Sequence, residues 1–112
     1  MKFSKGANLT AGVSNTILTV PNGYDCVVSM LFIANVGGST HSIGATWHDG
    51  ASVAFLAGKS VSAGDYIQFG GPEGAFLVMK EGDYITITPD ASSTFSSIIS
   101  FDMYPAAPRL NI

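Results

Sequence analysis

The sequence predicts an all-β domain: an antiparallel β-sandwich, jelly-roll-like, with about eight strands and no substantial helix. Apolar side chains recur at every second residue instead of with a helical period. Clusters of Gly, Pro, Asn, Asp and Ser interrupt the chain at short intervals, as turns do. Of the 112 residues, 46% are apolar and only 12% are charged, which is typical of a globular chain and not of a disordered one. Many short strands without a helical period favour a sandwich or jelly roll.

The residues YITIT show the strand pattern clearly, because Ile85 and Ile87 share one face while Thr86 and Thr88 share the other. Eight segments have this alternation, or a short apolar run bounded by turn residues, and we expect each to form a strand. In chain order they are residues 16–20, 25–35, 41–48, 52–57, 65–69, 75–80, 84–88 and 94–104.

The tetrapeptide GDYI occurs twice, at residues 64–67 and 82–85. In each copy, glycine can supply a turn conformation, aspartate can bond the backbone two residues further on, and Tyr-Ile can begin a strand. The repeat therefore predicts two similarly built hairpin edges, and a single echo is too short for a solenoid. The pair Asp49-Gly50 predicts a further hairpin turn.

The run DCVVSMLFIAN is apolar on both faces of the expected strand. Strict alternation places Val28, Met30 and Phe32 on one face, and Leu31 and Ile33 on the other. Such a strand is either central and covered by its own loops or lies at a subunit contact. The low charge content favours the contact, because the cores of interfaces are depleted in charge. We therefore predict a homo-oligomer with Val28, Met30 and Phe32 in its interface.

Both ends of the chain are expected to be arms that flank a sandwich domain of residues 16–104. Residues 1–15 are polar with no strand period, and residues 105–112 contain two prolines that would hold them extended. Frayed termini are the simpler interpretation. Apolar anchors nevertheless give the arms a means of attachment to neighbouring subunits. The residues expected to make this attachment are Phe3, Leu9, Arg109, Leu110 and Ile112.

Charge and hydropathy argue against several partners. The net charge is −3 with only five basic residues, so we expect no nucleic-acid binding. No apolar run approaches the roughly 20 residues that span a bilayer. The start MKFSKGANLTAG has no apolar core of a signal peptide, so synthesis in a cytoplasm is expected. Cys26 is the single cysteine, so no intrachain disulfide forms and a buried, inert thiol is expected.

Candidate catalytic groups are few. His41 and His48 are seven residues apart, which places them on opposite faces of a regular strand, and the paired histidines and glutamate of metal-bearing jelly rolls are missing. There is no GxSxG motif, and two of the aspartates, Asp65 and Asp83, belong to turns. The glycine-rich stretches lack the lysine and helix of a phosphate-binding loop. We therefore expect no catalytic residue, no metal and no cofactor, and a protein that is not an enzyme.

Trp47 and the four tyrosines could form a platform for a sugar, because aromatic faces stack on pyranose rings. The alternative is that they belong to the core and its rim. Trp47 falls on the same alternation as Ile43 and Ala45, which favours the core.

The stretches TILTVPNGYDCVVSMLFIANVGGSTHSIGATWHDG and LVMKEGDYITITPDASSTFSSIISFDMY resemble small all-β virion proteins of tailed bacteriophages. In those proteins a TVPxG turn leads into a long apolar strand ending in Asn, and a late GD turn precedes the final strand. The resemblance covers residues 16–104, and the terminal PAAPRLNI departs from it. It transfers no catalytic residue.

The resemblance implies a noncatalytic virion structural protein. The first expectation is a capsid decoration or cement protein on the head surface, a homotrimer whose partners are itself and the major capsid protein or other virion proteins. The alternative is a tail or fibre component that binds carbohydrate as a receptor. Neither expectation includes nucleic acid or a membrane as a partner.

Overall fold

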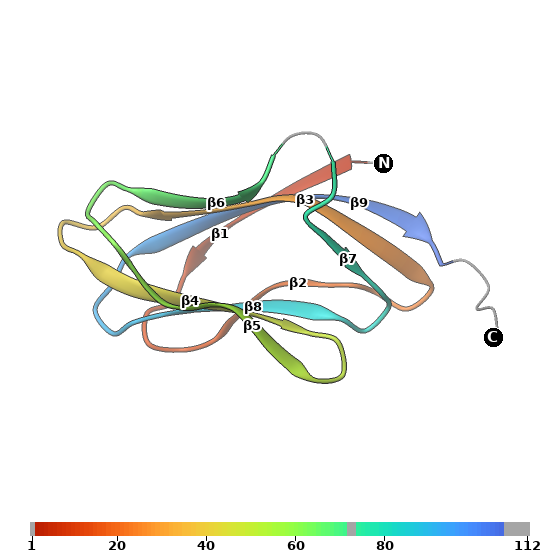
Figure 1. Ribbon diagram of the computed structural model, residues 1–112, viewed down its shortest axis with the longest axis horizontal. Helices are drawn as coiled ribbons and strands as arrows, with labels where there is room; N and C mark the ends of the chain where they lie inside the picture. Colours follow the sequence, from red (N-terminus) through yellow and green to blue (C-terminus); the bar gives the residue numbers. More distant parts are fainter. Residues whose placement is uncertain (1, 72–73, 107–112) are drawn as a thin grey trace.

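The computed structural model describes residues 2–71 and 74–106, which form nine strands and no helix. Two antiparallel sheets pack face to face (Figure 1). The strands are β1 (Lys2–Leu9), β2 (Asn15–Thr19), β3 (Tyr24–Asn35), β4 (His41–His48), β5 (Ser52–Val61), β6 (Tyr66–Gly70), β7 (Leu77–Met79), β8 (Tyr84–Pro89) and β9 (Phe95–Pro105).

The strand order confirms the predicted jelly-roll sandwich. One sheet has the order β1-β9-β3-β6, with the short β7 also paired to β3, and the other has the order β2-β8-β4-β5. All neighbours are antiparallel. The first and last strands lie side by side, and so do the second strand and β8, which is the arrangement that two Greek keys produce. All eight predicted strands are present.

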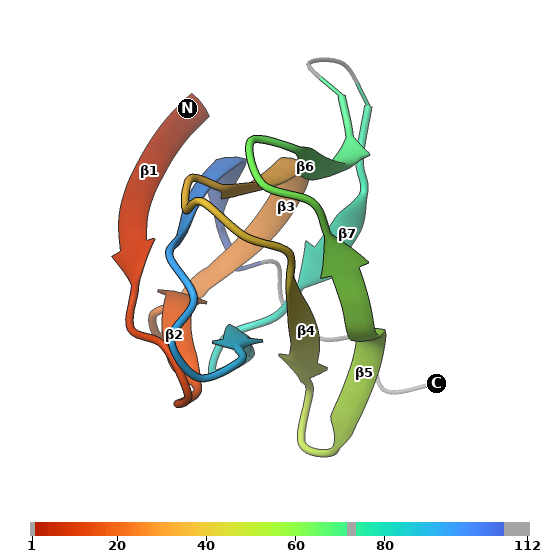
Figure 2. The ribbon, with the colours of Figure 1, turned by 90° about the vertical axis from the view of Figure 1, so that its left-hand side faces the viewer.

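The ninth strand, β1, corrects the expected N-terminal arm. It pairs with β9 along its whole length, from Lys2 opposite Asp102 to Leu9 opposite Phe95. Its sequence lacks a strand period because it is an edge strand with small polar residues on its outer side, and edge strands are under weak pressure to alternate. Figure 2 shows β1 along one side of the five-stranded sheet.

A β-bulge at Ser29 divides β3 into two halves. Val28 lies opposite Phe101, but Met30 already lies opposite Ser100, so β3 has one residue more than β9 at this point. Ser29 itself is buried, and its hydroxyl donates to the Ser100 carbonyl at 3.1 Å. The extra residue reverses the alternation. Strict alternation through β3 was therefore a wrong expectation.

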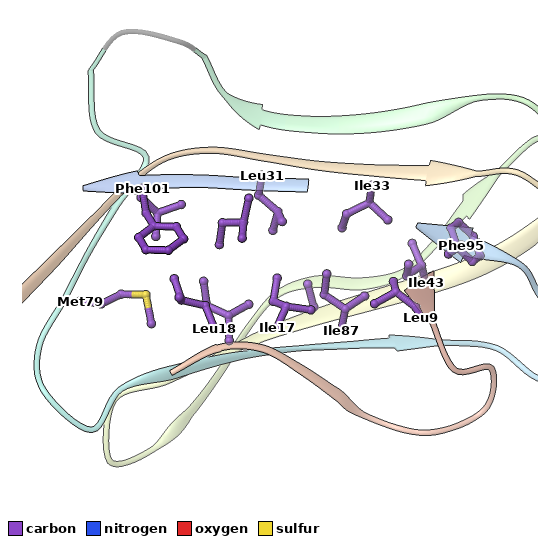
Figure 3. Packing of buried hydrophobic residues seen from close by; sticks show 14 of the residues in the cluster. Leu9, Ile17, Leu18, Leu31, Ile33, Ile43, Met79, Ile87, Phe95 and Phe101 are labelled. Atoms are coloured by element: carbon purple, nitrogen blue, oxygen red, sulfur yellow. The ribbon is translucent and has the colours of Figure 1, made fainter. Parts of the chain in front are cut away.

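Because of the bulge, both halves of β3 direct apolar side chains into the core. Cys26 and Val28 do so before it, and Leu31 and Ile33 do so after it; all four are fully buried. All four belong to the core cluster. Figure 3 shows Leu31 and Ile33 directed between the two layers, toward Ile17, Leu18 and Ile87 of the four-stranded sheet. The largest completely buried core side chains are Phe95, Leu31, Ile33, Ile43, Met79, Ile85, Ile87 and Ile99.

The bulge is also where β3 changes partners. β7 pairs with β3 before Ser29 and β6 pairs with it afterwards. The chain leaves β6 at Gly70, where φ is 71°, and a Cβ at this position would overlap the Ser29 carbonyl oxygen. Gly71 donates its N–H to that same oxygen at 3.1 Å. Only glycine combines this conformation with so close an approach.

Three phenylalanines close the side of the sandwich between β5 and β6. Phe55 comes from β5, Phe69 from β6, and Phe76 from the segment just before β7. Their ring centroids are 5.3–5.8 Å apart, with edge-to-face and stacked contacts, which are favourable aromatic geometries. The two sheets are thus joined at this side without a shared strand (Figure 2).

The two GDYI copies form the same turn twice. The glycines have φ values of 76° and 84°, and the Asp65 and Asp83 N–H groups donate to the carbonyls of Ser62 and Lys80, each at 3.0 Å. The aspartate side chains accept backbone hydrogen bonds, but from Tyr66 N–H and Lys80 N–H and not from two residues further on. The predicted turn is confirmed, and the predicted side-chain bond is corrected.

Neither copy is a hairpin edge, however. The first joins β5 to β6 and the second joins β7 to β8, so each lies where the chain passes from one sheet to the other. Each turn makes two backbone hydrogen bonds of 2.9 Å with one residue of an earlier part of the chain. The first turn bonds Asn35, the last residue of β3, and the second turn bonds Val20, the residue just after β2. The repeat therefore marks two equivalent corners of the sandwich.

We predict that Gly70→Ala lowers the free energy of unfolding by about 3 kcal/mol or more, at the upper end of point-mutant effects, because the new methyl group would displace the Ser29 carbonyl. Urea denaturation measures the change. Gly71→Ala is the matched control: nothing lies within 4 Å of a Cβ there, so a change within about 1 kcal/mol is expected. Equal costs at both positions would contradict the role assigned to the bulge.

Candidate functional site

The predicted interface residues are compared with the outer side of the five-stranded sheet, the side that faces away from the core. In the register of the sheet, three successive rows cross four of its five strands, β1, β9, β3 and β6, without a charged residue. We call these rows the outer face. They consist of Tyr66, Ala34, Ser96 and Asn8; Gln68, Phe32, Ile98 and Gly6; and Gly70, Met30, Ser100 and Ser4.

Two of the three predicted interface residues lie on this face. Met30 and Phe32 are half-buried there, and the Phe32 ring stacks on Tyr66 with centroids 4.9 Å apart. The third prediction, Val28, is corrected: it lies before the bulge and is completely buried in the core. Sequence reasoning missed Tyr66 and Ile98, which are 55% and 45% exposed. The Ile-Ile doublet that holds Ile98 was a usable signal, because one of two adjacent strand residues must face outward.

The next row on the outer side of this sheet carries charge, whereas Lys5 of β1 alternates with Ser4 and Gly6 and is paired with Ile99 of the core. The fourth row contains Asp102 opposite Lys2, and beyond it Lys80 Nζ lies 3.2 Å from Asp25 Oδ2. The outer face is therefore an apolar and hydroxyl-bearing surface that is bordered by ion-pairing side chains at one end, which is the pattern of an interface core beside its polar rim.

Of the five residues expected in attachment arms, two lie in the strand β1 and three lie outside the described residues. Leu9 is buried in the core of its own chain, and Phe3 stacks on Phe101 with centroids 5.6 Å apart. Both therefore stabilise the β1–β9 pairing and do not form an arm. Arg109, Leu110 and Ile112 lie outside the described residues.

His41, the first residue of β4, contacts the carboxylate of Asp90, the residue just after β8. Its Nδ1 lies 2.8 Å from Asp90 Oδ1, and its Nε2 lies 3.2 Å from the Ser39 hydroxyl. Asp90 Oδ2 accepts from the Ser42 N–H at 3.0 Å and from the Ser42 hydroxyl at 3.3 Å. The backbone hydrogen bond from Ser42, with the nearby charge of His41, lowers the pKa of Asp90.

His48 lies at the opposite end of β4 and has different neighbours. Its ring stacks on Tyr84 with centroids 4.2 Å apart, Nε2 lies 3.1 Å from the Thr86 hydroxyl, and Nδ1 lies 3.2 Å from the Ser52 hydroxyl. The two histidines thus share no partner. Within residues 2–71 and 74–106, no three His, Cys, Asp or Glu side chains are grouped so as to hold a metal ion.

An open cleft of about 590 Å³ lies between the β4–β5 turn and the β7–β8 turn. Trp47 lines it, together with the charged residues Asp49, Lys80, Glu81 and Asp83. Trp47 packs against the core, as its alternation predicted. Its indole Nε1 is buried and has no hydrogen-bond partner among the described residues.

Two carboxylates of this cleft accept hydrogen bonds from backbone N–H groups of nearby turns. Glu81 Oε2 accepts from the Gly23 N–H at 2.7 Å, and Asp49 Oδ1 accepts from the Ala51 N–H at 3.3 Å. The Asp49-Gly50 pair lies in the predicted hairpin, in which His48 is opposite Ser52 and three residues form the loop. The cleft therefore combines an aromatic wall with fixed acceptors.

Cys26 is buried in the core, as expected. Burial, and to a smaller extent the negative charge of Asp102, raises the pKa of its thiol to about 11. Because the thiolate is the reactive form, this cysteine is inert at neutral pH.

The comparisons with known proteins add no family to these observations: no protein-family model matches the chain, and no curated protein matches it. In the part of the chain that the structure describes, no helix has the length and apolar character needed to cross a membrane.

We predict that Asp90→Asn destabilises the fold above about pH 4 and has little effect at lower pH. An aspartate whose pKa is lowered by folding contributes stability above its unfolded pKa, and this contribution is lost as the pH falls through the lowered value. Urea denaturation of the wild type and the variant at about pH 6 and about pH 2 tests this. An equal difference at both pH values would contradict the ion pair.

Proposed function

We propose that this protein is a noncatalytic structural component of a bacteriophage virion, a capsid decoration or cement protein that assembles as a homotrimer. The observation that carries the proposal is the charge-free outer face, with Phe32 stacked on Tyr66 and Ile98 exposed. The resemblance of residues 16–104 to small virion proteins supplies the biological setting. The jelly roll is compatible with it, since viral capsid domains use this fold, but a fold alone does not define a function.

The outer face suits a contact between protein surfaces better than contact with water. Large exposed apolar areas are unfavourable in water and mark interaction sites in soluble proteins. The neighbouring serine hydroxyls of the face already have partners, since Ser100 bonds Ser4 and Ser96 bonds Asn8. Covering the face would therefore leave these polar groups satisfied, which removes a common cost of burial.

In a cyclic trimer, the outer face of each subunit contacts a different surface of the next subunit, and the third contact closes the ring. A virion repeats the attachment of each subunit many times, so a weak contact with the capsid is sufficient. We assign that attachment to the C-terminal residues Arg109, Leu110 and Ile112.

Ile98→Lys should weaken self-association by about tenfold or more, which corresponds to about 1.4 kcal/mol, because the contact would bury an unpaired charge. Analytical ultracentrifugation over a concentration series measures this. The wild type is expected at three times the 11.6 kDa mass of one chain, and the variant is expected to shift toward that single mass.

Val53→Lys is the matched control, since Val53 is also 45% exposed and lies on an edge strand of the other sheet. It should leave the association unchanged. A wild type that remains monomeric at high concentration, or two variants that dissociate equally, would refute the proposed interface.

A second candidate function is carbohydrate binding by a tail or fibre component. The cleft beside Trp47 favours it, because an aromatic wall with carboxylate acceptors suits a sugar ring, and the buried indole N–H has no partner among the described residues. In this case Trp47 would stack on the sugar, and the carboxylates of the cleft would accept from its hydroxyl groups.

Trp47→Ala should abolish glycan-array binding, and Trp47→Phe, which keeps an aromatic ring but lacks the N–H, should weaken it. Circular dichroism must show the same β-sheet spectrum for each variant. Tyr24→Ala removes an aromatic ring that is 44% exposed and does not line the cleft, so its binding should be unaffected. No glycan bound by the wild type would eliminate this candidate.

A further inference from the structure

Two hydrogen bonds connect the end of the described chain with the cleft beside Trp47. The N–H of Ala106, the last described residue, donates to the Gly23 carbonyl at 2.8 Å. The Gly23 N–H donates in turn to Glu81 Oε2 at 2.7 Å, and Glu81 lines the cleft. The chain therefore leaves the five-stranded sheet next to a residue of the cleft.

The cleft has an excess of negative charge. The described residues that line it include the acids Asp49, Glu81 and Asp83 and a single base, Lys80. Lys80 Nζ lies 3.2 Å from Asp25 Oδ2, so a carboxylate outside the cleft lining already compensates its charge. Each of the three acids uses one oxygen to accept a backbone N–H. Among the described residues, the second oxygen of each carboxylate remains able to accept from a cation.

The cleft also offers an apolar wall and a donor. Trp47 and Val78 line it, and Val78 is 51% exposed. The indole Nε1 of Trp47 is buried and has no acceptor among the described residues. A buried donor without a partner costs free energy, so a carbonyl group in the cleft would be stabilising. The cleft thus suits an occupant that combines a cation, an apolar side chain and a carbonyl.

The C-terminal sequence contains these three groups within six residues, 107–112. Arg109 is the only arginine of the chain, and a guanidinium pairs with carboxylates through two parallel hydrogen bonds. Leu110 follows it and provides the apolar side chain. Pro108 precedes it and provides a carbonyl without a backbone N–H that would need a partner in the cleft. The sequence of the segment therefore complements the charge and the polarity of the cleft.

The distance along the chain favours the segment of the same molecule over that of a second copy. Arg109 is three residues beyond Ala106, and three extended residues span about 10 Å. Ala106 itself is joined to the cleft residue Glu81 through Gly23 alone. A guanidinium at the end of a long side chain can thus reach the cleft within one chain, and a tethered group has a high effective concentration at its site.

We propose that the cleft beside Trp47 is the docking site of this chain's own C-terminal residues 107–112. The Arg109 guanidinium pairs with the carboxylates of the cleft, Leu110 packs against the wall of Trp47 and Val78, and a backbone carbonyl of the segment accepts from the indole N–H.

This docking does not rest on either proposed function, because the contact forms within one chain. It would nevertheless regulate both. The residues assigned to capsid attachment would be held by their own subunit until the capsid binds them more strongly, and a sugar would enter the cleft only after the segment leaves it.

A spin label at the end of the chain tests the docking directly. In Ile112→Cys the label attaches to residue 112 alone, because Cys26, the only native cysteine, is buried. The chain has one tryptophan, so a proton–nitrogen NMR spectrum contains one indole N–H signal. We expect the paramagnetic label to abolish this signal and reduction of the label to restore it.

A charge reversal and its matched control identify the contact. Adding Arg109→Glu to the labelled protein should restore the indole signal, because the segment would then be repelled by the cleft. Lys59→Glu makes the same change of charge at an exposed residue of β5 that does not line the cleft, so the signal should stay lost. Circular dichroism must show the same β-sheet spectrum for all variants.

A mixed sample distinguishes the two sources of the segment. Isotope-labelled wild type is combined with spin-labelled protein that carries no isotope, so only a contact between chains can broaden the indole signal. We expect the signal to keep its full intensity in this sample, whatever the oligomeric state.

Three results would overturn the docking. The indole signal could persist in the Ile112→Cys labelled protein, it could stay lost when Arg109→Glu is added, or it could be lost in the mixed sample, which would assign the segment to a second copy. An indole signal that responds to a glycan but not to the label at residue 112 would belong to the first case and assign the cleft to the sugar.

Discussion

The bulge at Ser29 is the constraint on which the rest of the structure depends. One inserted residue allows the two halves of β3 to direct side chains of opposite parity into the same core, with Val28 before the insertion and Leu31 after it. The carbonyl of Ser29 accepts a hydrogen bond from the Gly71 N–H, and the carbonyl of Val28 accepts one from the Phe76 N–H at 2.7 Å. Gly71, just after β6, and Phe76, just before β7, are thus both bound to β3 at the bulge. A bulge that bends and twists a strand while changing its partners is a structural device and not an irregularity.

The same insertion determines the character of the outer face. Since the core takes Leu31 and Ile33, the outer side receives Met30 and Phe32, and a sheet that would normally have a polar outer surface has an apolar one. The surface proposed for assembly is thus a direct result of backbone geometry within one strand. At the other end of that strand, the Asn35 side chain organises the loop into β4 through hydrogen bonds with the Ser39 carbonyl and the Gly37 N–H.

Much of the fold could be predicted from the sequence because the strands and turns are local. The alternation at Ile85 and Ile87 and the turns at Asp49-Gly50 and in the GDYI copies depend on residues that are close together in the chain. The strand β1 could not be recognised, because its polar edge residues gain stability only from pairing with β9.

The candidate sites were predicted less well. Val28 was assigned to the wrong face because a bulge leaves no mark in the hydrophobic pattern, and Asp90 could not be connected with His41 because the two are joined only by the packing of β4 against β8.

The sequence by itself determined the fold class, the positions of eight strands and the absence of a disulfide, because periodicity, turn chemistry and cysteine count are properties of neighbouring residues. Tertiary structure alone decided which side of β3 faces outward, where the repeated turns cross between the sheets, and which turns border the cleft beside Trp47. These features are set by long-range pairing and register, in which a shift of one residue exchanges the two faces of a strand.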